Sequence, residues 1–237
     1  MTDSVITLSL VVPDSRFQGV RIARRSDGRH IRLTNGRRHR AVGRYASIKM
    51  GSTIPWESRL ELHDLYRAEV DPAIVSYAVQ PETLQWEYVG KRHRYTPDRL
   101  DLMFDGSTRV VEIKDRFDPC QDAEYTDKLD QAAHIYAALG RAFEVRERSQ
   151  INVEPDFSAI EEIQAYRRSV VTVADVKLIR TLLRNGRLSL RDVLEGLERP
   201  NPRPVLFAMM VRRIVAIDLA QGLRGDATVS LVDRPCE

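Results

Sequence analysis

Asp98, Glu112 and Lys114 are the residues whose types and spacing indicate chemistry. Glu112 and Lys114 are two residues apart in a β-branched run, so we expect both on one face of a strand, with Ile113 pointing into the core. Asp98 enters the strand before it. Two carboxylates beside an ammonium group provide the hard oxygen ligands that Mg²⁺ or Mn²⁺ prefers. The set predicts a metal-dependent phosphodiesterase site.

The segment from residue 95 to 114 must position these side chains, and its pattern predicts a β-hairpin. Its two halves contain apolar residues at strand spacing, namely Leu100, Leu102 and Phe104 followed by Val110, Val111 and Ile113. Asp105-Gly106 between them is a turn signal. Asp101 is the alternative to Asp98 as a ligand, but it lies three residues further along and is expected to face the other way.

A helix is expected from about residue 55 to 70, capped by Ser52 or Thr53 and stopped at Asp71-Pro72. Glu57 and Glu61 are four residues apart and therefore lie near one face of this helix. Helical carboxylates are most often simply solvated, so the pattern alone does not assign either residue a function.

The rest of the central segment alternates between strand and helix signals. Strands are expected at 4–12, 73–80, 83–89, 91–96 and 143–145, and a helix at 122–139 that ends before Gly140. The apolar stripe of that helix should pack on the sheet, while the side chains of Lys128 and Gln131 could point toward the acidic site. These elements predict an α/β core in which helices flank a mixed sheet.

The C-terminal part has a different character. Helices are expected at 172–184, 189–197 and 203–213, with a turn at Asn185-Gly186 and a terminal β-hairpin. Three helices followed by a hairpin form a winged-helix-like module, a type that binds DNA in many cases and docks proteins in others. The expected organisation is a basic arm at 1–49, an α/β domain at 50–150 and a winged-helix-like domain at 151–237.

The first 49 residues are strongly basic, and we interpret them as an irregular arm that follows DNA phosphates. The alternative is a solvated tail with no partner. A second basic run lies just before the acidic site. The candidate DNA contacts in the two regions are Arg24, Arg25, Arg37, Arg38, Arg40, Lys91, Arg92 and Arg94.

Composition limits the class of protein. The formal net charge is +3 over 237 residues, a length that allows one large domain or two small ones. Cys120 and Cys236 are too far apart in sequence to suggest a disulfide framework or a zinc site. No apolar run approaches the ~20 residues of a membrane span, and the N-terminus lacks a signal-peptide pattern. We expect a soluble, cytoplasmic protein without membrane contact.

The central motif resembles the PD-(D/E)XK nuclease superfamily, with Pro97-Asp98 followed by Glu112-Ile113-Lys114. The wider arrangement over residues 50–148 looks like the N-terminal domain of the TnsA family, the endonuclease subunits of heteromeric transposases. The matching features include an S-x-L-E motif that ends at Glu61 and the Gln80-Pro81 pair. The resemblance implies a restriction-endonuclease-like fold.

The resemblance also implies an active site of Glu61, Asp98, Glu112 and Lys114. Asp98, Glu112 and the backbone carbonyl of Ile113 would hold one or two Mg²⁺ ions, for which Mn²⁺ substitutes, and Glu61 is a further candidate ligand. Lys114 would orient the attacking water or offset charge in the transition state. Some family members have Gln where this chain has Glu112.

The partners implied by the resemblance are double-stranded DNA at transposon ends, a DDE-type transposase that joins the 3′ ends and an AAA+ regulator ATPase. Cleavage at the 5′ ends would be the task of this chain. Two alternatives remain open from the sequence. One is a stand-alone restriction, repair or defence nuclease, and the other is a non-catalytic DNA-binding assembly factor built on a silent nuclease fold.

Overall fold

The computed structural model describes residues 4–26 and 41–232, and over these the protein is a mixed α/β structure with seven helices and several sheets. It divides into two compact units, Met1–Gly43 with Ser76–Arg148, and Arg44–Val75 with Ser149–Glu237. Each unit is therefore built from two separate stretches of chain, unlike the three consecutive segments expected from the sequence. Within the described residues, no helix combines the length and the apolar character that crossing a membrane requires.

The first unit contains a four-stranded antiparallel sheet. Its order is β1-β2-β6-β7, formed by Val5–Ser9, Phe17–Arg25, Glu82–Tyr88 and Lys91–Tyr95. The expectation of an irregular arm is wrong for β2. Its pairing with β6 shifts register between Gln18 and Arg21, where Gly19 has a φ of 56°. This bulge resets the alternation of side chains, so Phe17, Val20 and Ile22 are all buried although their spacing is not that of a regular strand.

The second sheet of this unit contains the acidic hairpin. Its order is β10-β9-β8-β5, formed by Arg141–Glu147, Thr108–Lys114, Arg99–Met103 and Ile74–Val79. β8 and β9 are antiparallel, and Gly106 turns between them with a φ of 82°, as the Asp105-Gly106 signal predicts. β9 and β10 are parallel, so the sheet is mixed as expected.

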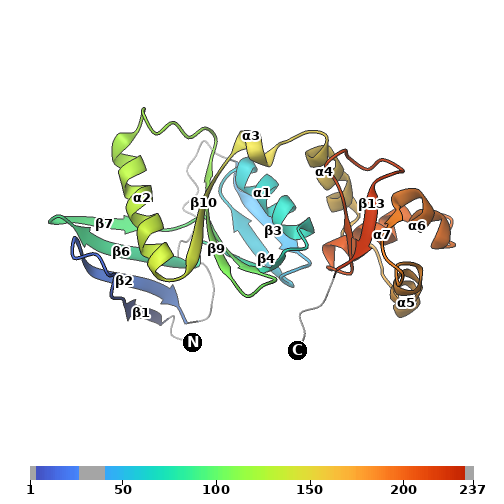
Figure 1. Ribbon diagram of the computed structural model, residues 1–237, viewed down its shortest axis with the longest axis horizontal. Helices are drawn as coiled ribbons and strands as arrows, with labels where there is room; N and C mark the ends of the chain where they lie inside the picture. The colour runs from blue at the N-terminus through green and yellow to red at the C-terminus, as the bar shows by residue number, and fades with distance from the viewer. Residues whose placement is uncertain (1–3, 27–40, 233–237) are drawn as a thin grey trace. The chain divides into compact units, whose positions relative to one another are not determined.

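Helix α2 (Ala123–Ala138) connects β9 to β10 and covers the core of the first unit (Figure 1). Asp122 caps its first turn, and Gly140 follows its end with a φ of 70°, in agreement with the sequence. Its buried side chains meet residues from both sheets of the unit. The core comprises Phe17, Val20, Ile22, Leu84, Trp86, Tyr95, Val110, Leu129, Ala132, Ile135 and Tyr136.

The second unit begins with a two-stranded sheet and a helix, β3 (Gly43–Ser47), β4 (Ser52–Trp56) and α1 (Arg59–Val70). The helix expected from residue 55 therefore starts four residues later, because Ser58 is the N-cap and its side chain accepts the N–H of Glu61. Pro55 lies in β4, and the proposed caps Ser52 and Thr53 are strand residues. The helix ends at Asp71 as predicted.

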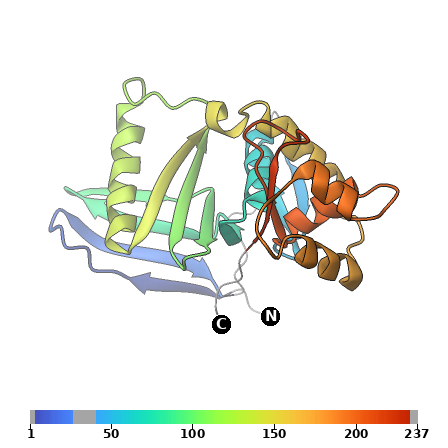
Figure 2. The same cartoon turned by 45° about the vertical axis from the view of Figure 1, so that its right-hand side comes forward.

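The C-terminal stretch of the second unit contains the three expected helices and the terminal hairpin (Figure 2). They are α5 (Val173–Leu182), α6 (Leu190–Gly196), α7 (Arg203–Val211), β12 (Val215–Ile217) and β13 (Thr228–Leu231). A short strand, β11 (Leu188–Ser189), adds to the hairpin in the order β11-β13-β12. α7 lies at the centre of the core, because every residue from Val205 to Val211 is buried.

Two further helices of the second unit, α3 (Arg148–Ile151) and α4 (Asp156–Tyr166), were not predicted from the sequence. α4 has no side-chain hydrogen bond at its N-cap, Pro155, so it lacks the local signal that marks the starts of α1, α2, α5 and α6. Contacts within the unit hold it instead. Arg67 of α1 pairs with Asp156 at 2.6 Å, and Gln164 accepts the hydroxyl of Tyr45 at 2.8 Å.

Candidate active site

Glu112 is a buried carboxylate with three hydrogen-bond donors around it. The residue is 4% exposed. Its Oε2 accepts the hydroxyl of Tyr95 at 2.8 Å, and its Oε1 accepts the hydroxyl of Tyr125 at 2.5 Å. The ammonium of Lys114 lies 2.8 Å from the same Oε1. Glu112 and Lys114 therefore share one face of β9, as strand geometry predicts, and this is the face that α2 covers.

Asp98 lies just before β8, where the hairpin brings it beside β9. Its Oδ2 accepts the backbone N–H of Ile113 at 2.7 Å. Its charge also helps to raise the pKa of Tyr95 and Tyr125, the two phenols that contact Glu112. Asp98 and Glu112 thus lie near each other at one end of the hairpin. Ile113, expected in the core, is only half-buried.

Tyr95 and Tyr125 are the part of this site that sequence reasoning missed. Burial raises the pKa of each phenol well above its ordinary value, and the adjacent Glu112 carboxylate raises it further. Both phenols consequently keep their protons and act as donors to Glu112. Tyr95 comes from β7 and Tyr125 from the first turn of α2, so only the tertiary structure brings them together.

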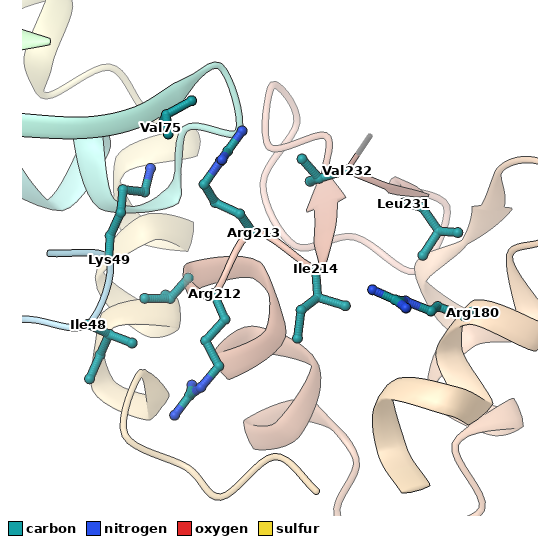
Figure 3. A pocket seen from close by; sticks show the side chains of 10 residues that line it. Ile48, Lys49, Val75, Arg180, Arg212, Arg213, Ile214, Leu231 and Val232 are labelled. Carbon is teal, nitrogen blue, oxygen red and sulfur yellow. The ribbon is translucent and has the colours of Figure 1, made fainter. Parts of the chain in front are cut away.

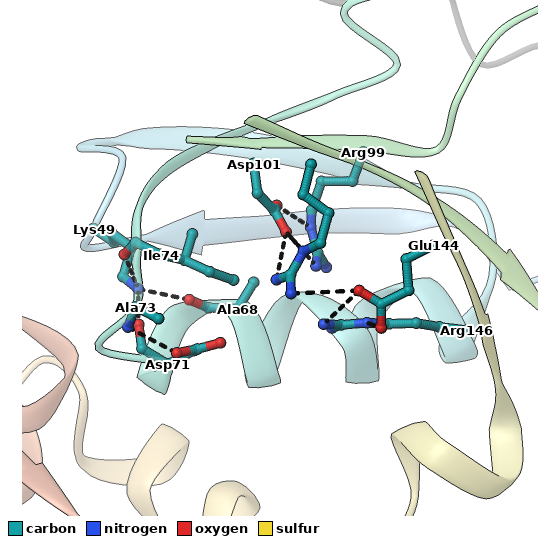
Figure 4. Close-up of polar contacts among 10 residues, drawn as sticks. Lys49, Ala68, Asp71, Ala73, Ile74, Arg99, Asp101, Glu144 and Arg146 are labelled. Atoms are coloured by element: carbon teal, nitrogen blue, oxygen red, sulfur yellow. Dashed lines mark hydrogen bonds and ion pairs between the residues drawn. The ribbon is translucent and has the colours of Figure 1, made fainter. Parts of the chain in front are cut away.

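Asp101, the alternative ligand, forms ion pairs with two arginines. It is 0% exposed and lies 2.6 Å from Arg99 and 2.9 Å from Arg109 (Figure 4). Burial alone would raise the pKa of Asp101, but the two guanidinium groups outweigh burial and lower it. Arg109 also approaches Glu144, which pairs with Arg146. This network is part of the fold of the first unit, and Asp101 has no role at the candidate site.

Glu61 belongs to the second unit, where its carboxylate contributes to the N-terminal cap of α1. Its Oε2 accepts the N–H of Glu57 at 2.8 Å, and its Oε1 accepts the hydroxyl of Ser58 at 3.0 Å. Glu61 is therefore the first-turn carboxylate that interacts with the helix dipole. Glu57, which the sequence placed in that turn, precedes the N-cap and lies outside the helix.

The candidate DNA contacts have different environments. Arg24 is tied to the fold, because it lies 2.7 Å from the buried Glu82. Lys91 pairs with Glu124 at 2.5 Å on the surface. Arg92 and Arg94 are exposed on β7, and the Arg92 side chain is 91% exposed. Arg25 ends β2 half-buried, and the three candidates at 37, 38 and 40 lie outside the described residues.

The second unit contains a separate basic cavity of about 640 Å³ (Figure 3). It is lined by Ile48, Lys49, Val75, Arg180, Val211, Arg212, Arg213, Ile214, Leu231 and Val232. Lys49 donates to backbone carbonyls at and beyond the end of α1, those of Ala68, Asp71 and Ile74, at 2.6, 2.8 and 2.9 Å (Figure 4). Arg213 donates to the carbonyl of Pro72 at 2.9 Å. These contacts give the two cations a structural role at the helix C-terminus.

The acidic pair meets part of the requirement for a divalent ion. Within residues 4–26 and 41–232, no group of three His, Cys, Asp or Glu side chains is arranged to hold a metal. A carboxylate has about four lone-pair sites, and the three donors at Glu112 leave one of them at Oε2. Asp98 and Glu112 can therefore supply two oxygen ligands, and water or DNA oxygens would complete the shell.

Comparison with known proteins adds no assignment, since no family model matches the chain and no curated protein is significantly similar to it. The motif and the geometry of the first unit are therefore the features that indicate a function.

Proposed function

We propose that this protein is a metal-dependent DNA endonuclease whose site contains Asp98, Glu112 and Lys114. The observation that supports it most is the convergence of Asp98 with the Glu112–Lys114 pair at one end of the β8–β9 hairpin. Two carboxylates and an ammonium group at the end of a mixed sheet match the donor set of PD-(D/E)XK nucleases. The order of strands and the helix between β9 and β10 are compatible with a restriction-endonuclease-like core.

Each residue would have a distinct task. Asp98 and Glu112, with the carbonyl of Ile113, would hold Mg²⁺ or Mn²⁺, and a bound ion supplies Lewis-acid chemistry at the scissile phosphate. Lys114, 2.8 Å from Glu112, is placed to orient a water molecule or to offset negative charge on the phosphate. The side chain of Lys114 is 28% exposed, so its ammonium group is accessible to a substrate.

The biological setting that we propose is cleavage of transposon ends, as in the TnsA family. A DDE-type transposase and an AAA+ ATPase would then be the partners, and the three helices with their terminal hairpin would serve as a winged-helix-like module. The support for this setting is the motif order from Glu61 to Lys114 together with the C-terminal arrangement of α5, α6, α7 and the β12–β13 hairpin.

Nicking of supercoiled plasmid by the purified protein tests the activity. We expect nicked product with Mg²⁺ or Mn²⁺ and none with EDTA. A DNA substrate with cognate ends, incubated with and without the partner transposase, separates a transposition subunit from a stand-alone nuclease. Absence of cleavage under every one of these conditions would contradict the proposal.

A non-catalytic DNA-binding factor is the second candidate function. It is favoured by the three donors on Glu112, because a carboxylate already neutralised by its neighbours is stable without a metal. The same experiment decides between the two, together with calorimetry of Mn²⁺ binding. A silent fold would bind duplex DNA but would show no heat of Mn²⁺ binding that depends on Asp98.

The role of Glu61 can be separated from its capping contacts. Gln keeps one of the two oxygens that accept the Glu57 N–H and the Ser58 hydroxyl, so Glu61→Gln should lower the unfolding free energy by no more than about 1 kcal/mol. If Glu61 belongs to the metal shell, single-turnover cleavage should fall by about a hundredfold, equivalent to ~3 kcal/mol. Glu57→Gln is the matched control and should change neither quantity. Normal cleavage by Glu61→Gln would leave Glu61 as a helix cap only.

Arg92 and Arg94 are the described cations best placed to contact DNA phosphates. The double variant Arg92→Ala/Arg94→Ala should weaken duplex binding and lower the slope of log affinity against log salt by roughly 1.8, about 0.9 for each lost contact. Fluorescence anisotropy over a salt series measures this slope. Arg16→Ala is the control, because Arg16 is surface-exposed but pairs closely with Asp14, at 2.6 Å, whereas Arg92 lies 3.9 Å from Glu87. Equal slopes for wild type and the double variant would exclude β7 from the interface.

A further inference from the structure

Tyr125 contacts both members of the Glu112–Lys114 pair. Its hydroxyl donates to Oε1 of Glu112 at 2.5 Å. The Nζ of Lys114 lies 4.2 Å from the centre of its ring, and the Nζ of Lys128 lies 4.6 Å from it. A hydrogen bond to a carboxylate is stronger than one between neutral groups, and an aromatic face attracts an ammonium group. One side chain thus constrains the carboxylate and the ammonium together.

The contacts of Glu112 put Tyr125 in competition with a metal. Oε1 already accepts both the Tyr125 hydroxyl and the Lys114 ammonium, which accounts for the two lone pairs of that oxygen. The lone pair left at Oε2 can bind an ion without displacing Tyr125, but an ion that uses both oxygens of Glu112, or Oε1 alone, must displace one of these donors and also repels the ammonium. The ring of Tyr125 provides Lys114 with a favourable position that does not depend on the hydroxyl, because Nζ already lies 4.2 Å from the centre of the ring.

We propose that Tyr125 is a positioning residue of the candidate site, a proposal that rests on the proposed nuclease function. Its hydroxyl holds Glu112 while no metal is bound and yields Oε1 to the ion. Its ring keeps Lys114 next to the metal ligands after that exchange. Tyr95 has no such role, since it contacts the other oxygen of Glu112 from a buried position on β7.

Two substitutions separate the functions of the hydroxyl and the ring. Tyr125→Phe removes the competing hydrogen bond and retains the ring, so calorimetry should show Mn²⁺ binding that is about tenfold tighter than in wild type. Tyr125→Leu removes both, so it should bind Mn²⁺ as Tyr125→Phe does but cleave DNA about tenfold more slowly than Tyr125→Phe. Tyr136→Phe is the control, because it removes a phenol from the same helix without a contact to Glu112.

A second measurement requires no functional enzyme. In protein labelled with ¹³C at the Cζ of tyrosine, the signal missing from Tyr125→Phe belongs to Tyr125. Adding Mg²⁺ to the wild type should shift that signal and leave the Tyr136 signal in place. If Mg²⁺ leaves the chemical shift of the Tyr125 signal unchanged, and wild type and Tyr125→Phe bind Mn²⁺ with equal affinity, Tyr125 is not a positioning residue. The nuclease proposal is unaffected by that result. Failure of wild type, Tyr125→Phe and Tyr125→Leu to bind Mn²⁺ overturns both.

Discussion

Asp98→Asn and Glu112→Gln should each reduce Mg²⁺-dependent nicking by roughly a thousandfold or more, which corresponds to ~4 kcal/mol of transition-state stabilisation. Both substitutions keep the shape of the side chain and remove the charge that would hold the ion. Affinity for duplex DNA should be unchanged or higher, because a negative charge that repels phosphate is lost. Plasmid nicking and fluorescence anisotropy on the same protein preparations measure the two effects separately.

Lys114→Ala distinguishes the ammonium from the metal ligands. It should be similarly inactive, but it should still bind Mn²⁺ in calorimetry, since Asp98 and Glu112 remain. Asp105→Asn is the matched control: it removes a charge from the same hairpin at its exposed tip, where the Asp105 carboxylate accepts hydrogen bonds from Ser107, two residues along. Wild-type nicking by Asp98→Asn or by Glu112→Gln would remove that residue from the site and with it the proposed chemistry.

Elements marked by local signals could be predicted from the sequence. The Asp105-Gly106 turn, the Asp122 cap with Gly140 after the helix, and the helices of the C-terminal stretch all follow from short-range sequence features. The relation between Glu112 and Lys114 was equally accessible, because alternation along a strand places residues two apart on one face. For these parts the local sequence and the tertiary structure favour the same conformation.

The parts that could not be predicted depend on contacts between distant residues. Because of the bulge at Gly19, the buried residues of β2 do not follow the regular spacing of a strand, and the sequence there predicts an irregular basic segment. The start of α1 was misplaced because Pro55 resembles a first-turn residue, whereas Ser58 and Glu61 form the actual cap. The donors to Glu112 come from β7 and α2, so no motif near Glu112 indicates them. For Asp101, alternation along β8 places Arg99 on the same face, but the second arginine, Arg109, comes from β9 and depends on how the two strands pair.

Asp101→Asn should destabilise the protein by about 3 kcal/mol at pH 7, the lower end of the range for breaking a buried ion pair. The reason is the environment of Arg99, which is 1% exposed and lies 2.6 Å from Asp101. Removal of the carboxylate takes from that buried guanidinium its ion pair with Asp101, and Arg109 loses its 2.9 Å contact as well. Urea unfolding followed by circular dichroism measures the loss.

The loss of unfolding free energy caused by Asp101→Asn should depend on pH in a defined direction. Because the folded-state pKa of Asp101 lies below its ordinary value, its contribution to stability is present above the unfolded pKa of about 3.9 and is lost as pH falls through the folded value. The difference between wild type and Asp101→Asn should therefore narrow below about pH 4, where protonated Asp101 resembles Asn. Asp130→Asn, at an exposed position on α2, is the matched control and should stay within about 0.5 kcal/mol of wild type. Equal unfolding free energies for Asp101→Asn and Asp130→Asn at pH 7 would show that the arginines do not depend on Asp101, and Asp101 would again be available as a ligand.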